Sequence, residues 1–229
     1  LVLPGPHSVR ILASDLYGHA DTKRVPVTIE GTVVSDQYPS GTWTAEEEPY
    51  VVCNNIYIQR GTTLTIEPGV KVMFWPHDGL PHGRYSLTAE GALRAMGTEQ
   101  DSIRFTSYKK QADRDTADWY CIVLMNNDPG DTLSDALSYA AVEYGGFYNH
   151  YYPGTSRTNI WIGFFARPTL RNCAIRRSGG YGILCSDWGH NPEITNCLFA
   201  ENAYYPVAIR AASVGMVSTQ NTFVDNGIQ

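Results

Sequence analysis

LRNCAIRRSG (170–179) recurs as ITNCLFAENA (194–203) and STQNTFVDNG (218–227), with a spacing of 24 residues and no gaps. Three registers repeat through these copies: Ile175, Phe199 and Phe223; Cys173, Cys197 and Asn221; and Ser178, Asn202 and Asn226. A fixed period with one apolar position kept and short polar stretches between is typical of a solenoid whose turns stack. We therefore expect a structural ladder of Ile175, Phe199 and Phe223, with Cys173 and Cys197 stacked beside it and Asn172 and Asn196 forming an amide ladder.

The same pattern continues upstream. In GTTLTIEPGVKVMF (61–74), apolar and polar residues alternate around a Pro68-Gly69 turn, and GALRAMGTEQDSIRFTS (91–107) repeats the plan. LSYAAVEYGG (137–146) aligns with the first copy of the repeat. Short strands at regular spacing indicate β structure throughout.

One segment allows another interpretation. DTLSDALSYAAVEYGG (131–146) also fits an amphipathic helix that ends at Gly145. We favour strands, because the neighbouring turns fix the geometry of this one and override local propensity.

The spacing between turns widens toward the N-terminus. If Phe74, Phe105 and Val142 continue the apolar register of Ile175, each step exceeds 24 residues. The extra residues lie in 75–84, 107–118 and 146–158, each after the corresponding strand. Because neighbouring turns are about 4.8 Å apart, insertions at one corner should stack into a single ridge.

These features carry a family resemblance. The segments TLTIEPGVKVMF and AEGALRAMGTEQDSIRFTS, and the Asn-Cys pairs at 172–173 and 196–197, make residues 42–229 resemble a right-handed parallel β-helix of the pectate-lyase-like superfamily. The repeat-containing group of secreted and cell-surface proteins is the most similar. The resemblance implies an extracellular or cell-surface location. It does not imply an activity, because the superfamily includes lyases, hydrolases, adhesins and proteins without known catalysis.

The N-terminal stretch differs. PGPHSVRILASDLYGHADTKRVPVTIE (4–30) predicts a β-hairpin, and it resembles the last two strands of bacterial immunoglobulin-like modules. An isolated hairpin is marginally stable, so this one needs further strands, and the chain is expected to be part of a longer protein. The expected organisation is all-β: terminal immunoglobulin-like strands (1–30), a linker leading into the solenoid (31–49) and the β-helix (50–229).

Composition limits the partners. The net charge is −6 and charged residues make up only 17% of the 229 residues, which disfavours nucleic acid as a partner. No apolar run approaches the roughly 20 residues that cross a bilayer.

Catalytic residues are hard to find. A sugar-cleaving enzyme needs paired carboxylates or a base with cationic support, and the weak candidates are Asp118, Asp187 and His190. The paired-Asp motifs of similar polygalacturonases and the Asp clusters of pectate lyases do not occur. The histidines lack the spacing of a zinc site, so we predict no metal and no cofactor, with Ca²⁺ in the acidic loops as the one alternative.

Aromatic residues crowd the predicted ridge. Tyr and Trp combine a flat apolar face with a polar tip, which suits sugar rings and protein interfaces, although long loops also need aromatics for a small core of their own. The candidate ligand-binding residues are Trp75, Tyr108, Trp119, Tyr148, Tyr151, Tyr152, Tyr181 and Tyr204.

Five cysteines cannot all pair within the chain. Cys173 and Cys197 are close enough for a disulfide, but in-register parallel neighbours point the same way, which favours free thiols.

The function expected from these features is a non-catalytic extracellular solenoid, adhesin-like, structural or filament-forming, that presents the ridge to a polysaccharide or to another subunit. The alternative is a polysaccharide lyase or glycoside hydrolase that uses acidic residues near the inserted loops.

Overall fold

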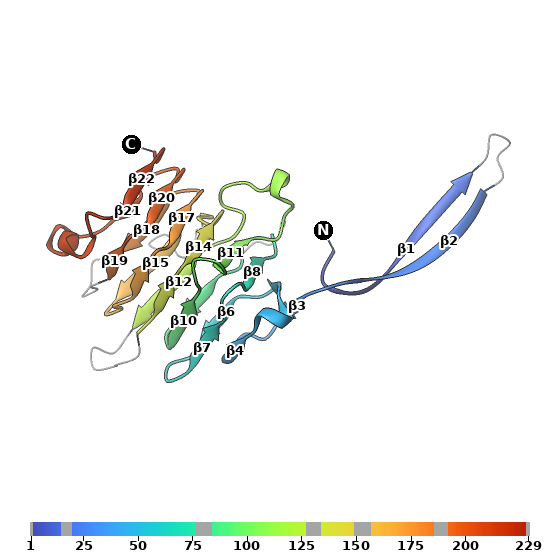
Figure 1. Ribbon diagram of the computed structural model, residues 1–229, viewed down its shortest axis with the longest axis horizontal. Helices are drawn as coiled ribbons and strands as arrows, with labels where there is room; N and C mark the ends of the chain where they lie inside the picture. Colours follow the sequence, from blue (N-terminus) through green and yellow to red (C-terminus); the bar gives the residue numbers. More distant parts are fainter. Residues whose placement is uncertain are drawn as a thin grey trace.

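The fold is seen in a computed structural model that describes residues 2–14, 20–76, 84–126, 134–148, 157–185 and 192–227. After an N-terminal hairpin, the chain winds through successive coils, each with up to three short strands, and strands at equivalent positions of adjacent coils pair in parallel. Figure 1 shows these coils stacked from β3 to β22. The all-β solenoid expected from the repeats is confirmed.

Three parallel sheets form the walls of the solenoid. Sheet 1 contains β4 (Gly41–Trp43), β7 (Thr63–Ile66), β10 (Ala92–Met96), β13 (Ala136–Ser138), β16 (Thr169–Arg171) and β19 (Glu193–Thr195). Sheet 2 contains β3 (Thr32–Val34), β5 (Tyr50–Val52), β8 (Lys71–Phe74), β11 (Ile103–Ser107), β14 (Ala140–Glu143), β17 (Ala174–Arg176), β20 (Leu198–Ala200) and β22 (Thr222–Val224). Sheet 3 contains β6 (Ile56–Ile58), β9 (Leu87–Ala89), β12 (Ile122–Asn126), β15 (Thr158–Phe164), β18 (Tyr181–Cys185) and β21 (Val207–Ala208).

Alternation along each strand builds the core. In β7, Leu64 and Ile66 are buried while Thr63 and Thr65, which alternate with them, are partly exposed, because successive strand residues point to opposite faces of a sheet. The inward residues of all three sheets form one continuous apolar cluster. Among the described residues, short 3₁₀ turns lie between strands at η1 (Ala45–Glu47), η2 (Gln111–Asp113) and η4 (Ala211–Met216). None of the described helices is long and apolar enough to span a membrane.

The apolar register runs as predicted at its C-terminal end, where Ile175 lies opposite Phe199 and Phe199 opposite Phe223. One upstream assignment is wrong. Phe105 lies opposite Val72, whereas Phe74 lies opposite Ser107, so the register is displaced by two residues. Both β8 residues point inward, and a period-two pattern by itself cannot choose between them. The first insertion is therefore two residues longer than the sequence suggested.

The segment with two interpretations is a pair of strands. Over its described part, residues 134–146 form β13 and β14, which pair in parallel with the coils on either side. The helix alternative is excluded there. Tyr139, between the two strands, has φ 45°, and this left-handed residue turns the chain sharply from sheet 1 to sheet 2.

The expected amide ladder of Asn172 and Asn196 does not form at the corner between sheets 1 and 2. Asn172 and Asn196 occupy left-handed positions with φ 54° and 55°, a conformation that asparagine tolerates better than most residues. In the part of the chain described, their side chains make no hydrogen bond. Side-chain amides bridge adjacent coils at other registers: Asn202 Nδ2 donates to the Ile175 carbonyl at 3.0 Å, and Asn226 Nδ2 donates to the Phe199 carbonyl at 2.9 Å.

The segment expected as a linker contributes strands. β3 pairs with β5 in sheet 2, and β4 pairs with β7 in sheet 1, so the solenoid sheets already include residues 32–43. Trp43 stacks on Tyr50 with ring centroids 4.6 Å apart, and both side chains are buried. The first coil is therefore held by an aromatic pair.

The N-terminal segment is the predicted hairpin. β1 (Gly5–Ser14) and β2 (Ala20–Ile29) pair antiparallel and form a two-stranded sheet of their own. Figure 1 shows the hairpin projecting away from the coils. Its identity as part of an immunoglobulin-like module stays a prediction.

Candidate functional site

The three inserted segments share one corner of the solenoid. Each of 75–84, 107–118 and 146–158 connects a sheet 2 strand (β8, β11 or β14) to the next sheet 3 strand. The strand order thus confirms the predicted common corner, although residues 77–83 and 149–156 lie outside the described residues. We call this surface the insertion corner.

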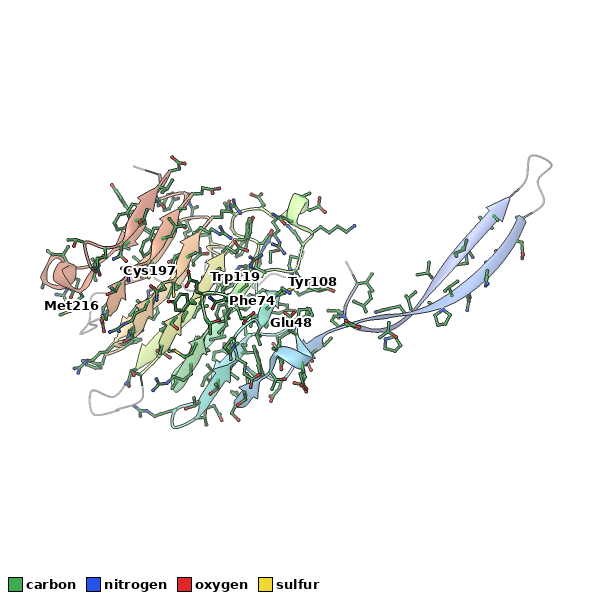
Figure 2. The ribbon with its side chains drawn as sticks, in the orientation of Figure 1. Glu48, Phe74, Tyr108, Trp119, Cys197 and Met216 are labelled. Atoms are coloured by element: carbon green, nitrogen blue, oxygen red, sulfur yellow. The ribbon has the colours of Figure 1, made fainter. Side chains whose placement is uncertain are left out.

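Trp119 ties the corner to the core. Its side chain has no exposed surface, its ring stacks on Phe74 at a centroid distance of 4.1 Å, and its indole N–H donates to the Glu143 carbonyl at 2.9 Å. Figure 2 shows the two rings among the coils. Trp119 therefore packs as a core residue and presents no surface to a ligand.

Asp118 is held in ion pairs beneath the second inserted segment. Its carboxylate is 1% exposed, Lys109 Nζ lies 2.6 Å from Oδ1, and Arg84 Nη1 lies 3.4 Å from the same oxygen. The Asp115 N–H donates to Oδ2. These contacts hold the segment in shape, and they leave this carboxylate committed to two cations.

Glu143 is the second buried carboxylate of this region. Arg176 Nε donates to Oε2 at 2.8 Å, and Thr106 Oγ1 donates to Oε1 at 3.0 Å. Arg104 Nε and Arg114 Nη1 each lie 3.9 Å from Oε1. Three guanidinium groups from two strands and one loop therefore surround a single carboxylate; we call these four charged residues the arginine cluster.

Tyr144 and Arg177 extend the cluster toward the corner. The Arg177 guanidinium lies over the Tyr144 ring at 5.6 Å, and its Nη1 donates to the Tyr144 hydroxyl. Arg177 also donates two hydrogen bonds to Glu201, at 3.0 and 3.2 Å. The hydrogen bond from Arg177 lowers the pKa of Glu201, and the pKa of Arg177 is raised in turn. Of the described carboxylates that could serve catalysis, Asp118, Glu143 and Glu201 are all bound to cations.

Exposed aromatic residues gather farther along the corner. The Arg157 guanidinium lies over the rings of Tyr148 and Tyr204, at 5.1 and 5.8 Å. Tyr181 meets Tyr204 edge-on at 5.4 Å and stacks near Tyr205 at 6.4 Å. Tyr148 and Tyr205 remain 38% and 42% exposed. We call these five residues the corner patch.

The backbone explains why the corner patch is compact. The Tyr181 N–H donates to the Arg157 carbonyl, and the Gly182 N–H donates to the Tyr205 carbonyl, so three consecutive coils are in direct contact. Gly180 allows this approach, since a Cβ there would lie 2.0 Å from the Arg157 carbonyl oxygen. Neighbouring coils thus bring residues about 24 positions apart in sequence onto one surface.

Two other candidates lie at the start of the corner. Trp75 and Tyr108 are half-buried, with rings tilted against each other at 5.1 Å, and the Tyr108 hydroxyl donates to the Val2 carbonyl. Burial raises the pKa of Tyr108. This pair contacts the chain that precedes the hairpin and is separate from the corner patch.

Several predicted site residues lie outside the described residues: Tyr151, Tyr152, Asp187 and His190. Within the described ranges, no group of three or more His, Cys, Asp or Glu side chains could hold a metal ion.

The cysteines are free thiols where the structure describes them, as favoured from the sequence. Cys173 and Cys197 are buried in adjacent coils, and the hydrogen bond with Cys197 raises the pKa of the Cys173 thiol. Burial likewise raises the pKa of Cys185 to about 12. With a raised pKa, Cys173 and Cys185 stay protonated, and protonated thiols are poor nucleophiles and poor metal ligands, so these two pack as small apolar groups.

Sequence reasoning missed Arg157 and Asn159. Arg157 stands within a Tyr-rich insertion, which was a usable signal for a cation–aromatic cluster. The sequence around Asn159 gave no such signal. Its buried side-chain amide donates hydrogen bonds to the Val142 and Arg176 carbonyls and accepts one from the Gly145 N–H, and these contacts depend on the fold. It fixes the backbone between sheets 2 and 3.

Two shallow hollows lie at the N-terminal coils, away from the corner patch. One is lined by residues that include Tyr38, Tyr57 and Arg60, and the other by residues that include Asp36 and Trp43. Neither is lined by a predicted site residue, so the corner patch is the better candidate.

Comparison with known proteins identifies the fold family. Residues 120–229 match the family described as "Right handed beta helix region". Neither the curated proteins nor the solved structures gave a significant match. Residues 120–229 therefore belong to the right-handed β-helix family, and because the parallel sheets continue upstream to β3, the whole solenoid is a right-handed β-helix.

Proposed function

We propose that this β-helix is a non-catalytic extracellular or cell-surface scaffold, adhesin-like or structural, that binds a polysaccharide through the corner patch. The observation that carries the proposal is the tyrosine set on adjacent coils, in which the Tyr181 ring lies against those of Tyr204 and Tyr205 in the next coil, and Tyr205 is exposed. Tyrosine rings offer flat apolar faces to sugar C–H groups, and their hydroxyls offer hydrogen bonds.

The rigidity of the patch supports binding. Arg157 lies over two of the tyrosine rings, and backbone hydrogen bonds fix the coils beneath them. A surface that is ordered before binding loses less conformational entropy when the ligand arrives. An extended ridge along stacked coils also suits a linear polymer better than a small molecule.

The carboxylates favour binding over catalysis. A general acid or base needs a carboxyl group that can exchange a proton with substrate, whereas Asp118 and Glu143 are buried and bound to Lys or Arg side chains. The lyase or hydrolase alternative thus loses Asp118 as a candidate, and its other two candidates, Asp187 and His190, lie outside the described residues.

Affinity gel electrophoresis tests the proposal. The protein is run through gels that contain soluble xylan, mixed-linkage β-glucan or galactomannan, and at least one should retard it. Tyr205→Ala should weaken that retardation about fivefold, because one aromatic contact typically contributes on the order of 1 kcal/mol. Tyr38→Ala is the matched control, since Tyr38 is a 50% exposed tyrosine at the N-terminal coils.

Two outcomes would overturn the proposal. One is retardation that depends on Tyr38 and not on Tyr205, which would move the site to the N-terminal hollow. The other is the lack of any retardation together with self-association that Tyr205→Ala abolishes, measured by sedimentation velocity. In that case the corner patch would bind another subunit.

A further inference from the structure

The arginine cluster carries more positive charge than its surroundings require. Arg104, Arg114 and Arg176 surround Glu143, which leaves an excess of two positive charges at one point of a protein whose net charge is −6. Converging guanidinium groups repel one another unless anions lie between them. One carboxylate neutralises only one of the three.

The strand geometry directs this charge outward. In β11, Phe105 is buried in the core, so Arg104 and Thr106 on either side of it point to the outer face of sheet 2. Glu143 lies opposite Arg176 in the neighbouring coil, on the same face. The side chains of Arg104 and Arg176 are 42% and 28% exposed, whereas those of Arg114 and Glu143 are 10% and 2% exposed. A molecule approaching from solvent therefore meets the guanidinium groups of Arg104 and Arg176 first and not the carboxylate.

Most guanidinium N–H groups of the arginine cluster donate no hydrogen bond to Glu143. Arg104 and Arg114 approach its Oε1 only to 3.9 Å, which is beyond hydrogen-bond distance. Because both nitrogens lie within 3.9 Å of one oxygen, they are at most twice that distance apart. Arg114 also lies over the Tyr144 ring at 5.7 Å, and its Nε donates to the Lys109 carbonyl at 3.0 Å, which leaves its Nη groups for a ligand and limits its movement. The donors are thus close together and one of them is held in place.

We propose that the arginine cluster is a binding site for an oxyanion, and that its ligand is a sulfate ester on a polysaccharide. A sulfate ester presents three terminal oxygens in a tetrahedral arrangement, which can accept hydrogen bonds from guanidinium groups converging from two strands and a loop. The choice of a polysaccharide as carrier rests on the proposed function: Tyr144, which contacts Arg114 and Arg177, lies two residues before the third inserted segment, 146–158. The oxyanion site itself rests only on the arginine geometry.

Isothermal titration with dextran sulfate and unmodified dextran tests this assignment. Dextran sulfate should bind and dextran should bind much more weakly at this site. Arg104→Gln should lower the affinity for dextran sulfate about fivefold and reduce its dependence on salt, while Arg104→Lys, which keeps the charge, should retain most of the affinity. Arg104 is partly exposed, so the thermal melting of these variants should stay close to that of the parent.

Arg171→Gln is the matched control. Arg171 is an exposed arginine of sheet 1, paired with Glu193, and its removal changes the net charge by the same amount. Equal losses for Arg104→Gln and Arg171→Gln would overturn the site, because binding would then follow net charge alone. Binding of duplex DNA as tight as that of dextran sulfate would overturn the sulfated polysaccharide as ligand.

The experiments can refute the corner patch and the oxyanion site independently of each other. If Tyr205→Ala weakens binding of a neutral polysaccharide while Arg104→Gln leaves dextran sulfate binding unchanged, the corner patch stands and the oxyanion site falls. If neutral polysaccharides do not bind while dextran sulfate binding depends on Arg104, the oxyanion site stands and the proposed function of the corner patch falls.

Discussion

Replacing Asp135 by asparagine should stabilise this β-helix at neutral pH. Asp135 is 5% exposed and directly precedes β13, and its Oδ1 accepts the Leu93 N–H from the adjacent coil at 2.8 Å. Burial raises the pKa of its carboxyl from 3.8 to about 7, although the Leu93 hydrogen bond and the charge of Arg94 act in the opposite direction. Asparagine keeps an acceptor oxygen for Leu93 and carries no charge.

The sign and size of the effect follow from proton linkage. The folded-state pKa of Asp135 lies above its unfolded value, so the folded protein binds more protons between about pH 4 and pH 7. Stability from this group is therefore highest at low pH and falls as the pH rises toward 7. A shift of about three pH units corresponds to about 4 kcal/mol at most, as an order of magnitude.

Urea unfolding of the parent and of Asp135→Asn at several pH values between 4 and 8 measures the effect. The difference between the two free energies of unfolding should grow with pH in favour of the variant and level off above pH 7. Asp135→Ala separates the two roles of the side chain, because it removes the charge and also leaves the Leu93 N–H without its partner. If the difference in free energy of unfolding between the parent and Asp135→Asn is constant across this pH range, the reasoning is refuted.

Three further predictions concern the scaffold. Phe199→Ala should lower the free energy of unfolding by about 3–5 kcal/mol, and Phe223→Ala by clearly less because that ring is 50% exposed; urea titrations compare the two. Gly163→Ala should lower the melting temperature, since a Cβ there would lie 1.9 Å from the Trp161 ring, and adding Trp161→Leu should restore part of the loss. Asn202→Ala should cost about 2–4 kcal/mol in the same urea assay, because two backbone groups in the preceding coil lose their partners.

The scaffold could be predicted because its coils repeat. Where the spacing is 24 residues, each side chain meets its own equivalent in the next coil, so the pairs Ile175 with Phe199 and Phe199 with Phe223 follow from alignment. Where an insertion separates two coils, the spacing is no longer constant, and alignment alone does not show which residues pair. Val72 and Phe74 are both apolar and both point inward, and only the hydrogen-bond register of β8 and β11 shows that Val72 is the partner of Phe105.

The sequence predicted where the candidate site lies better than it predicted which residues form its surface. The position of the insertions after sheet 2 strands located the corner, since every insertion at one corner must stack with the next. The sequence could not separate Trp119 from Tyr205, because both are aromatic and near the same corner. Burial separates them: Trp119 fills the space beside Phe74, whereas Tyr205 is left 42% exposed.

The buried residues of the corner explain why an irregular insertion can support a defined surface. A loop added to a solenoid gains no strand partners, so it needs other contacts to offset the entropy lost when it is ordered. Trp119 supplies apolar contacts on Phe74, and Asp118 fixes the loop through Lys109 and Arg84. Glu143 then holds Arg114 of that loop beside strand arginines of the repeating coils. Glu143 and Arg114 thus help to order the loop and also belong to the arginine cluster, so scaffold and proposed binding surface share these two residues.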